Sequence, residues 1–340
     1  MTPSATVPPD VDLVLRRLGL APRDPSTAFL GALIEGGVSS SVWRVDTATG
    51  PVCVKQPLAR LRVATVWEAP LERVMLEAQW LQSAGKIEPA AAPTVLGVDE
   101  RAHVLVMEWL EPANHPVWKS QLLSGVVVAG TAALLGERLG ALHCHMRTML
   151  EDPESRAVWM QASQLFEALR IEPYLLTTAE RSPAVRAELL EVAARLRSTR
   201  TTVIHGDVSP KNVLVGPTGP ILLDAECACA GDPAFDVAFL LNHLLLKAAH
   251  LPAHAAQLRT ATARFWQEYR ASAGAGGATE ESVVHVLPAL ALARVDGRSP
   301  VEYLTDAARA RVRARATDLV RTPCPSIDAI WDAWLADDPG

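Results

Sequence analysis

Residues 203–226 gather polar side chains whose types and spacing could do chemistry. The tripeptide His-Gly-Asp ends at Asp207, Asn212 follows five residues later, and Asp224 lies twelve residues beyond Asn212. A carboxylate can accept a proton from a reacting hydroxyl group. Carboxylate and amide oxygens are also the ligands that hard divalent cations prefer in proteins. The three side chains therefore predict a site, provided that the fold brings them together.

The same stretch predicts a β-hairpin that would bring them together. The short apolar runs Asn-Val-Leu-Val and Ile-Leu-Leu-Asp flank Gly-Pro-Thr-Gly, which is typical of a tight turn. If Val215 pairs with Pro220 across the turn, antiparallel pairing places Asn212 next to the position of Asp224. We therefore expect Asp207, Asn212 and Asp224 to gather at one end of the hairpin.

Two regions of different pattern surround the hairpin. Residues 30–110 carry short runs of β type, and one helical pattern interrupts them at residues 70–85. From about residue 120 onward the apolar residues recur at helical spacing, apart from the hairpin itself. The sequence therefore predicts an α+β fold with a small β-rich part and a larger, mostly helical part. We expect an N-terminal tail at residues 1–25, the β-rich domain at 26–112 and the helical domain at 113–340.

Composition narrows the class of protein and its location. The 340-residue chain has a net charge of −6 and 49% hydrophobic residues, which is typical of a globular protein and gives no sign of a nucleic-acid or membrane partner. It starts without a basic and apolar leader, and its apolar runs are shorter than the roughly 20 residues that span a bilayer. We therefore expect a cytoplasmic protein, whose oligomeric state stays open.

The cysteines give no sign of disulfide bonds, and the rarity of lysine makes individual lysines informative. The five cysteines form no disulfide pattern, and we interpret Cys227 and Cys229 as ordinary thiols, with a metal site as the alternative. Only five lysines stand against twenty-seven arginines. We therefore treat a lysine in a strand or in a buried position as a candidate functional residue.

The segment HGDVSPKN resembles the catalytic loop of protein-kinase-like phosphotransferases and is most similar to the aminoglycoside phosphotransferase family, which includes choline and methylthioribose kinases. The resemblance runs in order and spacing over roughly residues 30–250. It implies a two-lobed protein-kinase-like fold, ATP and Mg²⁺ as cofactors, and transfer of the γ-phosphate to a hydroxyl group. Such a transfer asks the protein mainly to position the acceptor and to neutralise charge on the phosphate oxygens.

The resemblance also implies a role for each polar residue around the hairpin. Asp207 matches the catalytic base, while Asn212 and Asp224 match the metal ligands. We expect His205 and Asp236 to be structural, with Asp236 bracing the catalytic loop from the start of a helix.

On the nucleotide side, the segment EGGVSSSVWRV matches the position of the family's phosphate-covering hairpin, and an ordinary hairpin turn is the alternative. Its expected phosphate contacts are Gly36, Gly37, Ser39 and Ser40. Lys55 lies in a strand that matches the V-A-I-K strand of kinases, so we expect it to hold the α- and β-phosphates. Cys53 shares its strand face, and we expect it to lie against the adenine.

Two further stretches complete the expected nucleotide site. Glu77 is the expected ion-pair partner of Lys55, with Glu72 as a second candidate and a solvated helix face as the alternative for both. The expected hinge strand offers backbone groups to the adenine, although such an apolar strand is commonly only part of the core. The hinge residues are Glu108, Trp109 and Leu110.

Departures from the kinase pattern bear on the mechanism and the acceptor. Gly206 stands where protein kinases carry an arginine, and Ser209 stands where Ser/Thr kinases carry a lysine near the transferred phosphate. Lys211 lies two positions further on, so the replacement cation stays open, with an arginine of the helical half as an alternative. Only twelve residues lead from Asp224 to Asp236, which leaves no room for a long activation segment. The acceptor is therefore expected to be a small hydroxyl compound.

The acceptor side carries weaker signals. Glu226 is a candidate contact to a second Mg²⁺ or to the acceptor, with a solvated carboxylate as the alternative. The polar loop that contains Arg294, Asp296 and Arg298 is the candidate wall of the acceptor site. Its two arginines suit an anionic acceptor or the negative charge of the transition state. We interpret His243, on an apolar helix, as a core residue. The mixed charges of the helical half disfavour a polycationic antibiotic, and the rival classes are a nucleotide-binding pseudokinase and a protein kinase.

Overall fold

The computed structural model describes residues 5–34, 39–60 and 69–336. Internal contacts divide the chain into two units, Met1–Asn114 with Leu223–Glu226 and His115–Leu222 with Cys227–Gly340. The expected domain boundary at residue 112 lies two residues before the first division. The segment Leu223–Glu226 belongs to the first unit, although the residues before and after it belong to the second. The sequence pattern did not predict this assignment.

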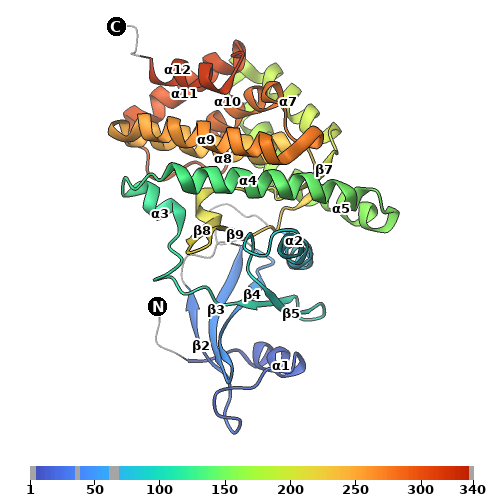
Figure 1. The fold of residues 1–340 in the computed structure, drawn as a ribbon. Helices are drawn as coiled ribbons and strands as arrows, with labels where there is room; N and C mark the ends of the chain where they lie inside the picture. The colour runs from blue at the N-terminus through green and yellow to red at the C-terminus, as the bar shows by residue number, and fades with distance from the viewer. Residues whose placement is uncertain (1–4, 35–38, 61–68, 337–340) are drawn as a thin grey trace. The chain divides into compact units, whose positions relative to one another are not determined.

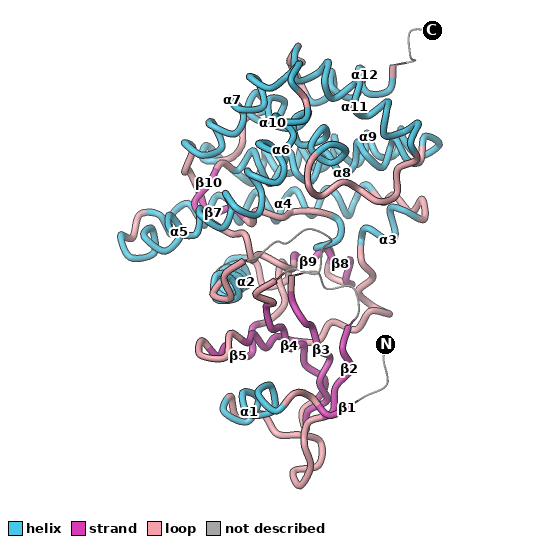
Figure 2. The backbone as a smooth tube through the Cα atoms, turned by 180° about the vertical axis from the view of Figure 1, so that it is seen from behind, coloured by secondary structure: helices cyan, strands magenta, loops and turns pink. Residues whose placement is uncertain are grey.

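The first unit is built on a six-stranded antiparallel sheet in the order β1-β2-β3-β4-β6-β5. Figure 2 draws its strands in magenta and labels β1 to β5. Its strands are β1 Ala5–Thr6, β2 Leu30–Ile34, β3 Ser40–Thr47, β4 Gly50–Pro57, β5 Val95–Asp99 and β6 Val104–Glu108. β3 and β4 pair along their whole length, with Ser40 opposite Pro57 and Thr47 opposite Gly50. The central strands thus form where the sequence shows β-type runs.

Helix α1, Pro9–Arg17, packs against this sheet and corrects the predicted N-terminal tail. Its residues Val11, Val14 and Leu15 are buried in one core with strand residues of β3, β4 and β6. Proline at the first helical position and acidic residues in the first turn both favour a helix start here. The apolar spacing of this segment is the signal in the sequence that indicates the helix, whereas its composition alone suggests a tail.

The second helix of the first unit is α2, Arg73–Ile87, which packs against the other face of β4. Alternation along the strand turns Val52 and Val54 toward the core that contains α1. Lys55 points to the opposite face, where its ammonium group meets a carboxylate of α2. The strand therefore separates an apolar core from a charged face.

The second unit is mostly helical. Its helices are α3 Trp118–Leu123, α4 Ala129–Met146, α5 Pro153–Phe166, the π-helix η2 Glu167–Leu176, α6 Thr177–Arg181, α7 Arg186–Ser198, the 3-10 helix η4 Pro210–Asn212, α8 Pro233–His250, α9 Ala255–Ala273, α10 Glu280–Asp296, α11 Asp306–Arg321 and α12 Ile327–Leu335. Short 3-10 helices lie at Arg147–Leu150, Pro183–Val185, Pro252–His254 and Gly274–Gly276. The long helices α4 and α9 lie side by side (Figure 1). A Cβ at Gly136 of α4 would lie 2.2 Å from the carbonyl oxygen of Phe265, so this close approach requires glycine.

The predicted hairpin is present in the second unit with the predicted register. Its strands are β8 Val213–Gly216 and β9 Gly219–Leu222, and Val215 lies opposite Pro220. A second antiparallel pair, β7 Thr202–Ile204 with β10 Cys229–Gly231, flanks the loop that carries the His-Gly-Asp tripeptide. Hairpin register is decided locally by the turn, which is why the sequence could predict it.

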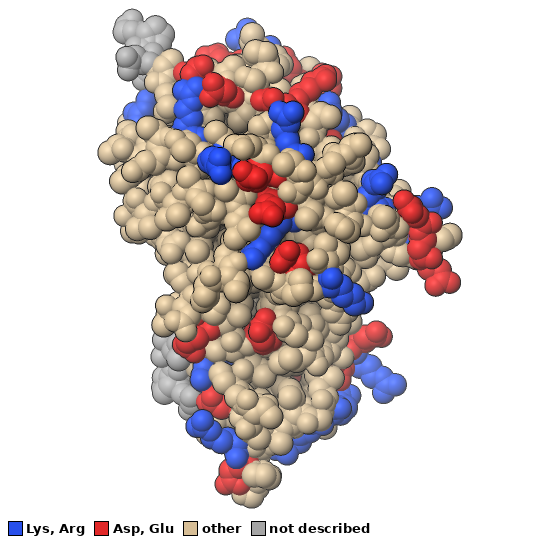
Figure 3. Space-filling view, viewed as in Figure 1, with Lys and Arg blue, Asp and Glu red and all other residues tan. Residues whose placement is uncertain are grey.

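The polar loop that the sequence placed around Arg294 is partly a helix. Arg294 and Asp296 lie in the last turn of α10, and only Arg298 lies in the loop that follows. Within the described residues, no helix is long and apolar enough to cross a bilayer. On the face drawn in Figure 3, acidic and basic side chains are interleaved across the surface.

Candidate active site

Asp236, in the first turn of α8, holds the backbone of the loop that follows β7. Its carboxylate accepts hydrogen bonds from the backbone N–H groups of His205 at 2.7 Å and Gly206 at 2.8 Å. His143 of α4 lies 3.1 Å from the same carboxylate, and the Tyr269 hydroxyl lies 2.9 Å from the other ring nitrogen of His143. Because Asp236 is 0% exposed, water does not compete for these contacts. The conformation of the loop is therefore set by the core of the second unit.

Gly206 occupies a position that excludes a side chain. Its φ is +77°, in the left-handed region, and a Cβ there would lie 2.5 Å from the carbonyl oxygen of Cys227. An arginine at this position would meet both backbone strain and a steric clash. The departure from the protein-kinase tripeptide thus has a local structural reason.

Asp207 is a buried carboxylate that three side chains orient. Asn212 donates from Nδ2 to Asp207 Oδ2 at 2.7 Å and to its backbone carbonyl at 3.0 Å. The guanidinium of Arg170 lies 3.0 Å from Oδ2, and the ammonium of Lys211 lies 3.1 Å from it. The backbone N–H of Asp207 donates to Nδ1 of His205 at 3.1 Å. The catalytic-loop residues within the second unit therefore come together around this carboxylate.

Arg170 and Lys211 are the two cations that could replace the lysine missing at Ser209. Arg170 lies in η2 and also donates from Nε to the carbonyl oxygen of Gly206 at 2.8 Å. The side chain of Lys211 is exposed, yet its ammonium reaches Asp207 as the i+4 neighbour, a contact that the sequence left open. The sequence around Arg170 does not distinguish it from the other helix arginines. In the structure it lies in a π-helix, a feature frequent at functional sites.

Asn212 and Asp224 fit the donor set of a Mg²⁺ site. Because Asn212 uses its Nδ2 to bind Asp207, its Oδ1 is left to accept, and no described residue donates a hydrogen bond to it. Asp224 has a φ of 66°, a positive value that aspartate adopts more readily than most other residues except glycine. Non-glycine residues in this region cluster at functional sites. Asn212 belongs to the second unit and Asp224 to the first, so the predicted gathering of the two stays a prediction.

A buried cluster of charges surrounds Lys55 in the first unit. Its Nζ lies 2.7 Å from Oε2 of Glu77 and also pairs with the carboxylate of Asp224. Burial alone would lower the pKa of Lys55, but the carboxylates of Asp224 and Glu77 raise it above its ordinary value, so the ammonium stays charged. Glu72, the second candidate partner, is exposed in the turn before α2.

This cluster predicts a pH-dependent stability. Burial raises the pKa of Glu77 to about 7. The positive charge of Lys55 opposes this rise, and the negative charge of Asp224 adds to it. The unfolded chain releases this proton near its ordinary pKa, so the folded protein binds it more tightly. The contribution to the free energy of unfolding is therefore complete below pH 4.5 and is lost as the pH rises through about 7.

We expect the Glu77→Gln variant to lose this decline, which amounts to roughly 3 kcal/mol. The measurement is urea-induced unfolding of both proteins at pH 4.5 and at pH 7.5. Glu72→Gln is the matched control, because it removes an exposed carboxylate from the same turn region. Parallel pH profiles for wild type and Glu77→Gln would contradict the assignment.

Arg73, at the start of α2, is a buried residue to which the sequence pattern assigns no role. Its Nε donates to Glu226 at 2.9 Å, and its two other nitrogens donate to the carbonyl oxygens of four residues. Those four residues are Ser39, Leu58, Ala69 and Pro70. Glu226 is consequently a buried ion-pair partner, which excludes the solvated carboxylate that was one alternative. Arg73 thus ties Glu226 to the segments at the ends of β4 and before β3.

The other residues that the sequence predicts on the nucleotide side are Gly36, Gly37, Ser39, Ser40 and Cys53. Gly36 and Gly37 lie outside the described residues. The backbone carbonyl of Ser39 accepts from Arg73 at 2.6 Å, and Ser40 is buried in β3. Burial raises the pKa of the Cys53 thiol to about 12, so it stays protonated at neutral pH. Contacts of these residues to a nucleotide stay predictions.

The expected hinge is the end of β6 and the segment after it. Glu108 accepts from the backbone N–H of Thr94 at 2.7 Å, and its own N–H donates to the carbonyl oxygen of Thr94 at 2.9 Å. Trp109 donates from Nε1 to Glu111 at 3.0 Å, and Leu110 is half-buried. The segment is therefore pinned to the start of β5 through Thr94, while its contact with adenine stays a prediction.

The three residues of the expected acceptor wall go to separate partners. Asp296 pairs with Arg313 of α11 at 2.7 Å, and Arg298 lies 3.6 Å from Glu172. Arg294 donates to the hydroxyl of Tyr174 at 3.1 Å and lines a small cavity near the catalytic loop. Only Arg294 therefore remains in a position that the acceptor could share with the catalytic loop.

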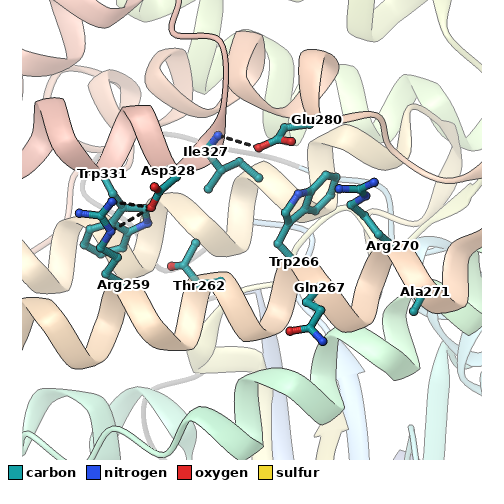
Figure 4. A pocket seen from close by; sticks show the side chains of 11 residues that line it. Arg259, Thr262, Trp266, Gln267, Arg270, Ala271, Glu280, Ile327, Asp328 and Trp331 are labelled. Carbon is teal, nitrogen blue, oxygen red and sulfur yellow. Dashed lines mark hydrogen bonds and ion pairs between the residues drawn. The ribbon is translucent and has the colours of Figure 1, made fainter.

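A cavity of about 510 Å³ between α9 and α12 is lined by none of the predicted site residues (Figure 4). Three of its charged residues have polar partners: Arg259 pairs with Asp328 and Asp332, and Glu280 accepts from the backbone N–H of Ile327 at 3.0 Å. Trp266 and Trp331 are among its apolar lining residues. This cavity contributes nothing to the catalytic loop.

A solved structure resembles most of this chain in fold. Amicoumacin kinase hAmiN, in complex with AMP-PNP, Ca²⁺ and Ami, matches with a TM-score of 0.56 and 15% sequence identity, over 92% of this chain and 93% of that one. At this identity the likeness concerns the fold alone. An antiparallel sheet in the first unit and a mostly helical second unit define a protein-kinase-like fold, as the sequence predicted.

The sequence comparisons identify the family. The model of the phosphotransferase enzyme family matches residues 31–275, and this chain belongs to that family. The methylthioribose kinase of Pectobacterium carotovorum subsp. carotovorum (strain PC1) is 29% identical over 71% of this chain, and that of Citrobacter koseri (strain ATCC BAA-895 / CDC 4225-83 / SGSC4696) is 28% identical over 71%. The matched part spans 66% of each relative, just under two thirds of its length. The resemblance on which the expected roles depended is thereby confirmed.

Proposed function

We propose that this protein is a kinase that uses ATP and Mg²⁺ to phosphorylate a hydroxyl group of a small molecule. The observation that carries the proposal is the catalytic loop of the second unit. Asp207 is buried there, oriented by Asn212 at 2.7 Å, and its loop is anchored by Asp236 in the core. Membership of the phosphotransferase enzyme family supports this choice over other uses of a buried carboxylate. A cytoplasmic location, predicted from the sequence, is part of the proposal.

In this proposal, Asp207 accepts the proton of the acceptor hydroxyl as its oxygen attacks the γ-phosphorus. A new O–P bond forms, the bond from the γ-phosphorus to the bridging oxygen breaks, and ADP leaves. Asn212 and Asp224 would hold the Mg²⁺, which neutralises charge on the phosphate oxygens. Lys55, held by Glu77, would bind the α- and β-phosphates.

The acceptor is proposed to be small, because only the short stretch with β10 lies between Asp224 and α8. Methylthioribose is the first alternative within the fold, since the curated relatives that match are methylthioribose kinases. Choline-type acceptors are a second alternative within it. A pseudokinase that binds nucleotide without transfer is the alternative outside it.

ADP release with Mg-ATP across a panel of hydroxyl acceptors tests the proposal. The panel holds methylthioribose, choline, aminoglycosides, simple sugars and hydroxy acids. We expect acceptor-dependent release that requires Mg²⁺ and disappears on chelation with EDTA. Nucleotide binding without release on every acceptor would favour the pseudokinase instead.

A further inference from the structure

A small cavity of the second unit adjoins the catalytic loop, and four of its nine lining residues are cations. It has a volume of about 30 Å³, room for one or two water molecules or for the oxygens of one small anionic group. Its four cations come from four separate elements: Lys119 of α3, Lys211 of η4, Lys247 of α8 and Arg294 of α10. Lys211 connects it to the catalytic loop, because its ammonium lies 3.1 Å from Asp207.

Lys247 is the most unusual of these cations. The chain has only five lysines, and three of them line this one cavity. Lys247 is 1% exposed, and no described residue forms a hydrogen bond or an ion pair with its Nζ, which lies 5.2 Å from the centre of the Tyr303 ring. The Tyr303 hydroxyl and Nε of Arg294 likewise lack a hydrogen-bond partner among the described residues. Buried cations are normally paired, so these groups lack a partner that a ligand could supply.

The acidic groups around the cavity are already engaged. Glu302, the lining acid, pairs with Lys119. Asp207 is shared between Lys211 and Arg170. Among the described residues, Lys247 and Arg294 are therefore the two lining cations without an ion-pair partner.

We propose that this cavity binds an anionic group of the acceptor, a carboxylate or a phosphate, so that the substrate is a hydroxy acid or a phosphorylated alcohol. The inference rests on the proposed function and narrows its substrate class. An anion here would pair with Lys247 and Arg294, while Lys211 marks the side from which the hydroxyl would reach Asp207. A polycationic acceptor would meet like charge at the same place.

The protonation of Lys247 offers a specific signature. Burial, with added repulsion from Lys119 and Arg294 and partial compensation by Glu302, lowers the pKa of Lys247 to about 7. His243, which also lines the cavity, has its pKa lowered well below its usual value by burial and by the same cations, so it is neutral at pH 8. Burial raises the pKa of Tyr303 above its ordinary value, so its hydroxyl stays protonated between pH 7 and 8. An anion bound at pH 8 would therefore draw up to about one proton onto Lys247.

The first test is calorimetric titration of the full chain with sulfate or acetate at pH 8, in two buffers of different ionisation enthalpy. Neither anion titrates there, sulfate stands for a phosphate group, and acetate for a carboxylate. We expect proton uptake with the anion class that fits, none in Lys247→Met, and unchanged uptake in Lys86→Met, an exposed lysine of α2. Sulfate at Lys55 would add no proton, because that ammonium stays charged. No proton uptake with either anion, or uptake that persists in Lys247→Met, would overturn the proposal.

The second test compares glycerol, glycerate and glycerol 3-phosphate as acceptors at pH 6.5 and pH 8.5. We expect kcat/KM to favour an anionic acceptor by at least about tenfold at pH 6.5, less at pH 8.5, and not at all in Lys247→Met. Because a buried unpaired lysine opposes folding, the methionine variant should remain folded, which its unfolding curve would verify. An equal loss with neutral and anionic acceptors would contradict the inference.

The two proposals can fail separately. Proton uptake without ADP release on any acceptor would leave the anion site standing and remove the kinase. ADP release without proton uptake would leave the kinase standing and remove the anion site.

Discussion

Asp207→Asn is expected to lower kcat by about 10²- to 10⁴-fold while leaving the affinity for ATP nearly unchanged. Asparagine keeps the shape of the side chain and its contact with Asn212, but it cannot accept the proton of an attacking hydroxyl. ADP release under saturating acceptor gives kcat, and titration with a fluorescent ATP analogue gives the affinity. A loss confined to kcat would separate a general base from a binding residue.

Asp318→Asn is the matched control for this variant, since it neutralises an exposed carboxylate of α11 in the same unit. We expect it to leave both quantities unchanged. Because Arg170 and Lys211 would face a neutral amide, the unfolding curve of Asp207→Asn should be measured alongside its activity. Turnover at the wild-type rate would remove Asp207 from the role of base.

Arg73→Ala is expected to lower the free energy of unfolding by about 3–5 kcal/mol. This is the largest change in stability that we expect from a substitution in the first unit. The variant would leave Glu226 buried without its partner and would deprive four carbonyl oxygens of their donor. Urea-induced unfolding measures the change. Arg101→Ala, which truncates an exposed arginine of the same unit, should stay within about 0.5 kcal/mol of wild type.

A double-mutant cycle distinguishes the ion pair from the carbonyl contacts of Arg73. Combined with Arg73→Met, the change Glu226→Gln removes the unpaired charge, so the double variant should recover part of the loss seen in Arg73→Met alone. Strict additivity of the two changes would show that the contact with Glu226 contributes nothing. The stabilising effect of Arg73 would then come from its carbonyl contacts alone.

The structure changed several expectations, each for a physical reason. Residues 9–17 form a packed helix because Val11, Val14 and Leu15 share one helical face, whereas composition alone suggested a tail. Asp296 pairs with Arg313, so it is committed to the packing of α10 on α11. His243 is buried against Phe239, as its apolar helix favoured, and it also lines the small cavity near Lys211, which the sequence did not indicate.

The sequence by itself determined what short-range geometry decides. The turn sets the register of the hairpin, so the turn residues alone are enough to place Val215 opposite Pro220. Strand alternation likewise placed Lys55 and Cys53 on one face of β4. The resemblance to the phosphotransferase family followed from residue types at fixed spacing, and the family comparison bears it out.

Only the tertiary structure decided which distant charges meet. Arg170 reaches Asp207 from η2, Arg73 reaches Glu226 across 153 residues, and Lys247 is enclosed by cations from three other elements. A charged residue on a helix has the same local pattern whether it faces water or a buried partner. Burial and long-range pairing depend on how helices pack, and packing is a property of the whole unit.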